Sequence, residues 1–182
     1  MATRPTRRLT YDDYVRFPDD GRRWELIDGE AYMVPSPDAG HQLIAGYVYR
    51  RVAGYLDEHG GGIAFIAPFD VKLADDEVFQ PDVIFISDAD ADVLTSKNIT
   101  GVPTWVVEVV SDPVRDKRVK RDVYMRFGVS EYWAVDPHLR SIEVHRPDEA
   151  VVIVEAPGRV SPRALPSLAI DLDELFGAAR GL

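Results

Sequence analysis

The hexapeptide WVVEVV at positions 105–110 decides the expected fold, because its residues are apolar on both sides of one acid, Glu108. A run of this kind predicts a central strand that is buried on both faces. An ionised carboxylate cannot stay unpaired in such a strand, because burying an isolated charge is very costly. The side chain of Glu108 must therefore be compensated by a metal ion, by a lysine or arginine, or by a proton.

A second acid heads another apolar segment, VFQPDVIFI at positions 78–86, which predicts a strand with Asp82 near its start. Strand alternation places Glu108 on the same face as Val106 and Val110. If the two strands are neighbours, the carboxylates of Asp82 and Glu108 converge. Together with a main-chain carbonyl such as that of Val109, they form the hard oxygen set that Mg²⁺ or Mn²⁺ prefers. Metal-assisted hydrolysis of phosphodiesters is the leading hypothesis.

Cations follow in the next segment, where Ser-Asp-Pro at 111–113 suits a helix start and Gly128 suits its end. In a helix over these residues Asp116 and Lys120 lie on one face, and Tyr124 extends the same stripe. A lysine near the carboxylates can orient or deprotonate the attacking water, or stabilise charge on the transferring phosphate. Spacing alone favours the alternative, an ordinary surface Asp–Lys pair contributing about 0.3–0.5 kcal/mol.

Length and composition are those of a water-soluble globular protein. The 182 residues are most simply one domain spanning 1–182, and 21 Lys and Arg against 31 Asp and Glu give a net charge of −10. This charge argues against a protein that coats nucleic acid through its overall field. Cysteine is absent, which is consistent with a cytoplasmic location. Residues 1–10 lack the apolar core of a secretory signal, and no apolar run is long enough for a membrane partner to be expected.

The remaining pattern predicts an α/β protein. Asp-Gly at 28–29 favours a tight turn, so residues 24–34 are expected to form an N-terminal β-hairpin. A long helix is expected from about 38 to 59, before the glycines at 60–62. Further strand-like segments lie at 63–66, 69–73, 131–135, 142–146 and 151–154, with a short helix at 172–179. This order predicts a mixed central β-sheet flanked by helices.

A set of short motifs follows the same order along the chain. They are WELIDGE at 24–30, SP at 36–37, HQ at 41–42, PFDV at 68–71, QPDV at 80–83, VEVVS at 107–111, the 116–120 segment with Tyr124, and FGVSEYWAVDP at 127–137. Each motif is short, but the ordered set is specific, and the likeness extends from about residue 11 to 146. Together these motifs resemble the Uma-type restriction endonuclease family, a branch of the PD-(D/E)XK nuclease superfamily.

This resemblance implies a restriction-endonuclease-like core, a divalent-metal site, DNA as the substrate and a possible homodimer. It assigns Asp82 to the superfamily's aspartate and Glu108 to its second acid. The lysine that should stand two residues after the second acid is replaced by Val110. In this branch Lys120 is expected to take its role, with Lys117 as the substitute.

Two more residues of these motifs have open roles. Glu25 either joins the metal site as an additional acid or pairs with Arg22 or Arg23 at a sheet edge. His41 begins the long helix on the side of Ile44, so it can bind phosphate, orient Glu25, or simply be a half-buried histidine with satisfied hydrogen bonds. Besides a Mg²⁺-dependent nuclease, two functional hypotheses remain. One is a non-catalytic binding or assembly protein on a nuclease fold, and the other is a purely structural Glu108 paired with a core cation.

Overall fold

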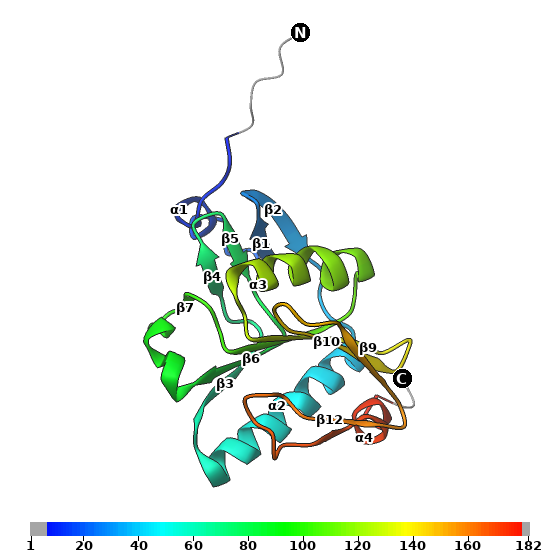
Figure 1. Cartoon of the computed structure of the whole chain (residues 1–182). Helices are drawn as coiled ribbons and strands as arrows, with labels where there is room; N and C mark the ends of the chain where they lie inside the picture. The colour runs from blue at the N-terminus through cyan, green and yellow to red at the C-terminus, as the bar shows by residue number, and fades with distance from the viewer. Residues whose placement is uncertain (1–6, 180–182) are drawn as a thin grey trace.

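A computed structural model describes residues 7–179 of the chain, so the sequence expectations for residues 1–6 and 180–182 lie outside the described part. Its centre is a six-stranded sheet (Figure 1). In spatial order the strands are β11 (Val152–Glu155), β10 (Ser141–His145), β9 (Glu131–Asp136), β8 (Trp105–Val109), β6 (Val83–Ser87) and β3 (Gly62–Ile66). Strands β8 and β9 are parallel and the other neighbours are antiparallel, so the sheet is mixed. The predicted α/β class with a mixed sheet is confirmed.

The predicted N-terminal hairpin belongs to a second sheet of five strands. These are β2 (Glu30–Val34), β1 (Arg23–Ile27), β5 (Glu77–Phe79), β4 (Val71–Ala74) and β7 (Ile99–Thr100). Asp28 and Gly29 have φ values of 55° and 73°, which are the positive values that a type I′ turn requires at both central positions. A third sheet pairs β12 (Arg159–Val160) with β13 (Ile170–Asp171).

One expected strand is two strands in the structure. Residues 78–86 were expected to be continuous, but β5 ends at Phe79, β6 begins at Val83, and the two lie in different sheets. Pro81 between them has no N–H to donate to a sheet, so it favours a break. The connection of residues 80–82 therefore passes from one sheet to the other and carries Asp82.

Helix α2 (Ala39–His59) covers one face of the six-stranded sheet, as Figure 1 shows. It starts at Asp38, whose side chain accepts a hydrogen bond from the backbone N–H of His41, and it ends before Gly60. Its buried side chains Ile44, Val48 and Val52 belong to an apolar cluster that extends to strands β6, β8 and β9. This helix matches the one predicted for residues 38–59.

The opposite face of the sheet is covered by the segment that was expected to be one helix up to about residue 127. Its first part, η2 (Arg115–Lys120), is a π-helix, and it continues as α3 (Arg121–Phe127), which ends at Gly128 with φ 86°. The aromatic rings of Tyr124 and Tyr132 pack there at 5.3 Å between centroids. The shorter helices are α1 (Tyr11–Tyr14), η1 (Asp88–Val93) and α4 (Leu172–Gly177). Over the described residues, no helix has both the length and the apolar character needed to cross a membrane.

Candidate active site

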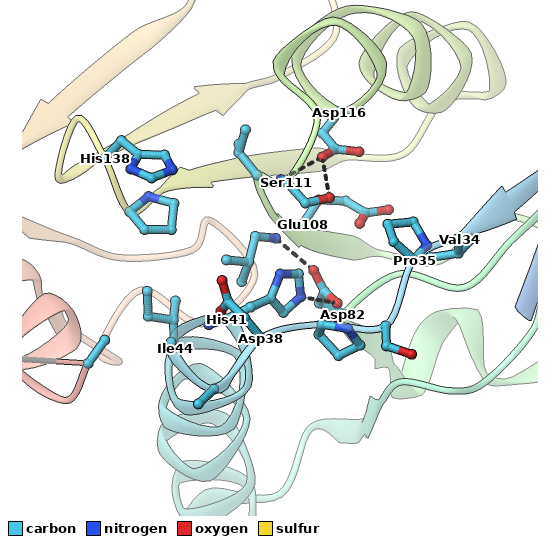
Figure 2. Close-up of a pocket in the computed structure, with 18 of the residues that line it drawn as sticks. Val34, Pro35, Asp38, His41, Ile44, Asp82, Glu108, Ser111, Asp116 and His138 are labelled. Atoms are coloured by element: carbon cyan, nitrogen blue, oxygen red, sulfur yellow. Dashed lines mark hydrogen bonds and ion pairs between the residues drawn. The ribbon is translucent and has the colours of Figure 1, made fainter. Parts of the chain in front are cut away.

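A cavity of about 670 Å³ opens where β8 ends, α2 begins and η2 passes over the sheet (Figure 2). Four residues singled out from the sequence line it, namely Asp82, Glu108, Val109 and Lys120. The fifth, Glu25 of β1, is fully buried and is absent from the cavity wall, but it contacts Lys120. The structure therefore brings together all the residues predicted for the site.

Lys120 lies between two buried carboxylates. Strand alternation in β8 turns Glu108 toward η2, and the Lys120 Nζ donates to Oε1 of Glu108 at 2.9 Å and to Oε1 of Glu25 at 2.8 Å. The exposed fractions are 3% for Lys120 and 4% for Glu108. Of the three possible compensators of Glu108, the structure shows a lysine. Tyr124 adds a weaker hydrogen bond from its hydroxyl to Glu108 Oε1 at 3.3 Å.

The charges in this cluster are unbalanced. Burial opposes the charge of Lys120, but Glu108, Glu25 and Asp116 outweigh it, so the pKa of Lys120 is raised above the ordinary lysine value. Burial raises the pKa of Glu108 well above its usual range; Lys120 opposes this rise, whereas Asp82 and Glu25 add to it. One ammonium group thus faces several acids. The cluster favours additional positive charge, whether a proton or a cation.

Asp82 is held from two sides. Its Oδ2 accepts a hydrogen bond from the backbone N–H of Val109 at 2.8 Å, and its Oδ1 lies 2.8 Å from Nε2 of His41. The register of β6 and β8 aligns Val83 with Val107, so Asp82 stands beside the end of β8. His41 points toward the sheet as expected, but its partner is Asp82 and not Glu25 (Figure 2).

Asp116 and Lys120 do not form an ordinary surface pair. Both are buried, and the Asp116 Oδ1 to Lys120 Nζ distance is 4.0 Å. The other oxygen of Asp116 accepts hydrogen bonds from the backbone N–H groups of Ser111 and Asp112, at 2.9 Å each. Asp116 therefore fixes the turn between β8 and η2, which places the start of η2 over the cavity.

Lys117, the substitute lysine, points to a different part of the protein. Its Nζ lies 2.7 Å from Oε1 of Glu143 and 2.9 Å from Oδ2 of Asp136. These partners belong to β10 and β9, and Lys117 does not line the cavity. The structure places Lys120, and not Lys117, beside the predicted acids.

Glu25 has a different partner from the arginines weighed for it. Arg22 bonds to Asp20, and Arg23 donates to the carbonyl of Pro35. Besides Lys120, Glu25 Oε1 accepts a hydrogen bond from the backbone N–H of Gln80 at 3.1 Å. Its Oε2 is buried and has no hydrogen-bond partner within residues 7–179. The alternative in which Glu25 pairs with Arg22 or Arg23 at a sheet edge is therefore wrong.

Within the described part of the chain, no three acidic or histidine side chains gather closely enough to hold a metal ion by themselves. The predicted ligand set contains only two side chains, Asp82 and Glu108, with a main-chain oxygen as the third member. Mg²⁺ commonly keeps several waters and uses one or two carboxylates together with substrate phosphates. A pair of acids at this cavity is consistent with such a site.

Residues 11–173 match the model of the Uma2 family, whose description is "Putative restriction endonuclease". The chain belongs to the Uma2 family. No curated protein matches the chain. A crystal structure of "a putative nuclease belonging to DUF820" from Anabaena variabilis superposes with a TM-score of 0.80 at 19% identity, covering 94% of this chain and 99% of that one. The family resemblance stated from the sequence is confirmed, and family and fold together support a nuclease-type function.

Sequence reasoning missed two features of this Uma2 family site. The contact of His41 with Asp82 crosses 41 positions of the sequence and depends on how α2 is placed. Its only local signal was Asp38 as a helix N-cap, which fixes His41 in the first turn. Arg115 also lines the cavity and was noted only as part of a basic segment.

Proposed function

We propose that this chain is a divalent-metal-dependent endonuclease that hydrolyses phosphodiester bonds in DNA, with Mg²⁺ as the metal and Mn²⁺ as a substitute. One observation carries the proposal. The carboxylate of Asp82, just before β6, and that of Glu108 in the neighbouring strand β8 line the same cavity as the buried ammonium group of Lys120. Two acids beside a fixed cation are what phosphodiester hydrolysis needs, because negative charge develops on the phosphate as the bond breaks.

The donor set fits a hard cation. Asp82, Glu108 and the main-chain oxygen of Val109 are the groups that would hold it, and all are oxygen donors. Each carboxylate oxygen of Asp82 has one protein partner, which leaves a lone pair for a second contact. The unpartnered Oε2 of Glu25 adds negative charge behind Lys120. When bound, a divalent ion polarises the phosphate and lowers the pKa of a bound water.

Lys120 is assigned to charge stabilisation. The acids around it raise its pKa, which favours the protonated ammonium over the neutral amine that would act as a base toward water. Its ammonium group instead stabilises negative charge on the phosphate and orients the attacking water. Glu25 holds Lys120 in place from the side opposite the cavity, through the 2.8 Å contact.

The proposal includes the wider expectations drawn from the sequence. These are a single domain over residues 1–182, a cytoplasmic location and assembly as a homodimer. Light scattering coupled to size-exclusion chromatography tests the dimer, and cell fractionation tests the location.

A second candidate is a binding or assembly protein that keeps the nuclease fold without catalysis. It is favoured by the absence of a third acid or histidine at the pair over residues 7–179, and by the salt bridge that already occupies Oε1 of Glu108. The net charge of −10 also disfavours strong nucleic-acid binding.

Cleavage assays separate the two candidates. Purified protein is incubated with supercoiled plasmid, single-stranded DNA and RNA in Mg²⁺, in Mn²⁺ and in EDTA. The nuclease proposal expects cleavage of DNA only with metal, and a loss of about a thousandfold or more in Asp82→Asn and in Glu108→Gln. Calorimetry with Mn²⁺ then measures binding that depends on both acids. Intact substrates under all conditions, with no such metal binding, would favour the second candidate.

A further inference from the structure

One arginine on the cavity wall has no part in the function proposed so far. Arg115 is the first residue of η2, and it lines the cavity beside Glu108, Asp116 and Lys120. Its side chain is 16% exposed, so it is largely enclosed by protein but still reaches the cavity. The one hydrogen bond of this side chain with residues 7–179 runs from Nε to Oδ1 of Asp116 at 3.4 Å, which is near the limit for a hydrogen bond.

Asp116 does not need this arginine as a partner. The carboxylate accepts hydrogen bonds from the backbone N–H groups of Ser111 and Asp112, and its other oxygen lies 4.0 Å from the Lys120 ammonium. The two terminal nitrogens of Arg115, Nη1 and Nη2, make no hydrogen bond to any described residue. Arg115 therefore presents a planar pair of donors that residues 7–179 leave unused.

The other arginines of the cavity wall are already engaged. Arg23 donates from Nη2 to the carbonyl of Pro35, and Arg140 donates from Nη2 to Asp173 at 3.0 Å and lies over the ring of Phe176. A guanidinium group with free terminal nitrogens can bind two oxygens of a phosphate in a bidentate contact. In a chain of net charge −10, such a local cation is also what allows an anionic polymer to approach two carboxylates.

We infer that Arg115 binds a phosphate group of the nucleic-acid backbone and thereby holds the strand against Asp82 and Glu108. The inference rests on the proposed function, because it assumes that a nucleic acid enters this cavity. It assigns Arg115 a direct contact with the substrate, separate from the role of Lys120, two of whose ammonium donors are used by Glu25 and Glu108.

Arg118 provides a matched control. It belongs to the same π-helix and carries the same charge, but it is exposed and faces a shallower hollow on the outer side, lined by Lys117, Arg121 and Glu143. Arg118→Ala therefore changes the net charge of the protein as much as Arg115→Ala does, without touching the cavity.

The test measures binding apart from cleavage. Fluorescein-labelled short single-stranded and duplex DNA are titrated with wild type, Arg115→Ala, Arg115→Lys and Arg118→Ala, in Ca²⁺, and gels verify that the DNA stays intact. Fluorescence anisotropy gives Kd over a series of salt concentrations. Circular dichroism verifies folding, and Arg115→Lys keeps the charge and the aliphatic stem in case the alanine variant is unstable.

The inference expects Arg115→Ala to raise Kd about tenfold or more, because a charge-assisted contact is lost. The slope of log K against log salt should fall in magnitude by about 1. Arg115→Lys should lie between the wild type and Arg115→Ala, and Arg118→Ala should change Kd by less than about threefold. Equal losses in the two alanine variants, an unchanged Kd in Arg115→Ala, or no binding by the wild type would each overturn the inference.

The same samples distinguish this inference from the proposed function. DNA binding that depends on Arg115, with plasmid left intact in Mg²⁺ and Mn²⁺, would refute hydrolysis and keep the phosphate contact. Metal-dependent cleavage with an unchanged Kd in Arg115→Ala would support hydrolysis and refute the phosphate contact of Arg115.

Discussion

Strand β8 has two buried faces of different chemistry. Trp105, Val107 and Val109 lie on the α2 face and belong to an apolar cluster that includes Val48 of α2. On the other face, Glu108 and Lys120 are buried beside apolar neighbours. Apolar burial stabilises a fold directly, whereas a buried ion pair is weak evidence for stability because its desolvation is costly. We therefore attribute the α2 face to folding and the η2 face to chemistry.

The largest effect is expected on the η2 face from Lys120→Ala. Removing the cation leaves Glu25 and Glu108 buried without a counter-charge, so the free energy of unfolding should fall by about 3–5 kcal/mol. DNA cleavage should fall at least about a hundredfold. Urea denaturation and plasmid cleavage rates measure the two effects.

A combined variant separates the two losses. Lys120→Met with Glu25→Gln and Glu108→Gln removes the charge of Lys120 and those of the two acids bonded to it, so it should recover much of the lost stability and none of the cleavage. Full cleavage by Lys120→Ala would show that the ammonium group has no chemical role.

A smaller effect is expected from His41→Ala, which removes one partner of Asp82. Loss of a group that orients a metal-binding carboxylate typically costs about 10–100-fold in metal affinity or activity. Calorimetry with Mn²⁺ and the rate constant of cleavage at saturating DNA measure it. His41→Gln, which can still donate to Asp82, should recover part of the activity. If both variants cleave like the wild type, the contact is only structural.

Substitutions of the two lysines of η2, Lys117 and Lys120, should have different kinds of effect. Lys117→Ala is expected to leave cleavage unchanged and to lower stability by about 1 kcal/mol, because it removes hydrogen bonds to Asp136 and Glu143. Loss of cleavage in this variant, with Lys120→Ala still active, would reverse the assignment of the two lysines.

The stability lost in Lys117→Ala should depend on pH. Burial raises the pKa of Asp136, but Lys117 and the backbone N–H of Leu139 lower it by more, so it lies below the ordinary value of 3.8. A carboxyl group whose pKa is lower in the folded state stabilises that state at pH values above its unfolded-state pKa. This contribution is lost as the pH falls through the folded-state pKa. The gap between wild type and Lys117→Ala should be largest above about pH 5 and should narrow toward pH 3. Thermal unfolding across this range measures it.

The smallest effect is expected on the α2 face. Ile142→Val in β10 removes one buried methylene group and should cost about 0.5–1.5 kcal/mol with unchanged cleavage. Chemical denaturation and the cleavage assay verify both parts. A clear loss of cleavage would mean that the two faces are not independent.

Much of the fold was readable from local patterns. The Asp28-Gly29 turn predicted the hairpin, the spacing of Ile44, Val48 and Val52 predicted α2, and the acid among valines predicted a buried partner for Glu108. These signals are local, because turn chemistry and periodicity act over a few residues. The sequence did not reveal that the strands divide into separate sheets, because this depends on which strands the residues after Pro81 pair with.

The sequence predicted which residues form the site better than it predicted the contacts between them. Asp82, Glu108, Glu25 and Lys120 were singled out, and they do meet. The partners of Asp82 and Asp116 were not foreseen, because His41 and the N–H groups of Ser111 and Asp112 reach them only once the helices are placed. The π-helical turn was also missed, because the spacing of four between Asp116 and Lys120 suggests an ordinary α-helix and not a wider one.

The contact between Glu25 and Lys120 has a consequence for biosynthesis. These residues are 95 positions apart, so the constellation cannot form until the chain has been made as far as Lys120. A nascent or prematurely terminated product that stops before η2 has both acids and no lysine beside them. Under the proposed function, such a fragment lacks the cation of the site and is expected not to cleave nucleic acid.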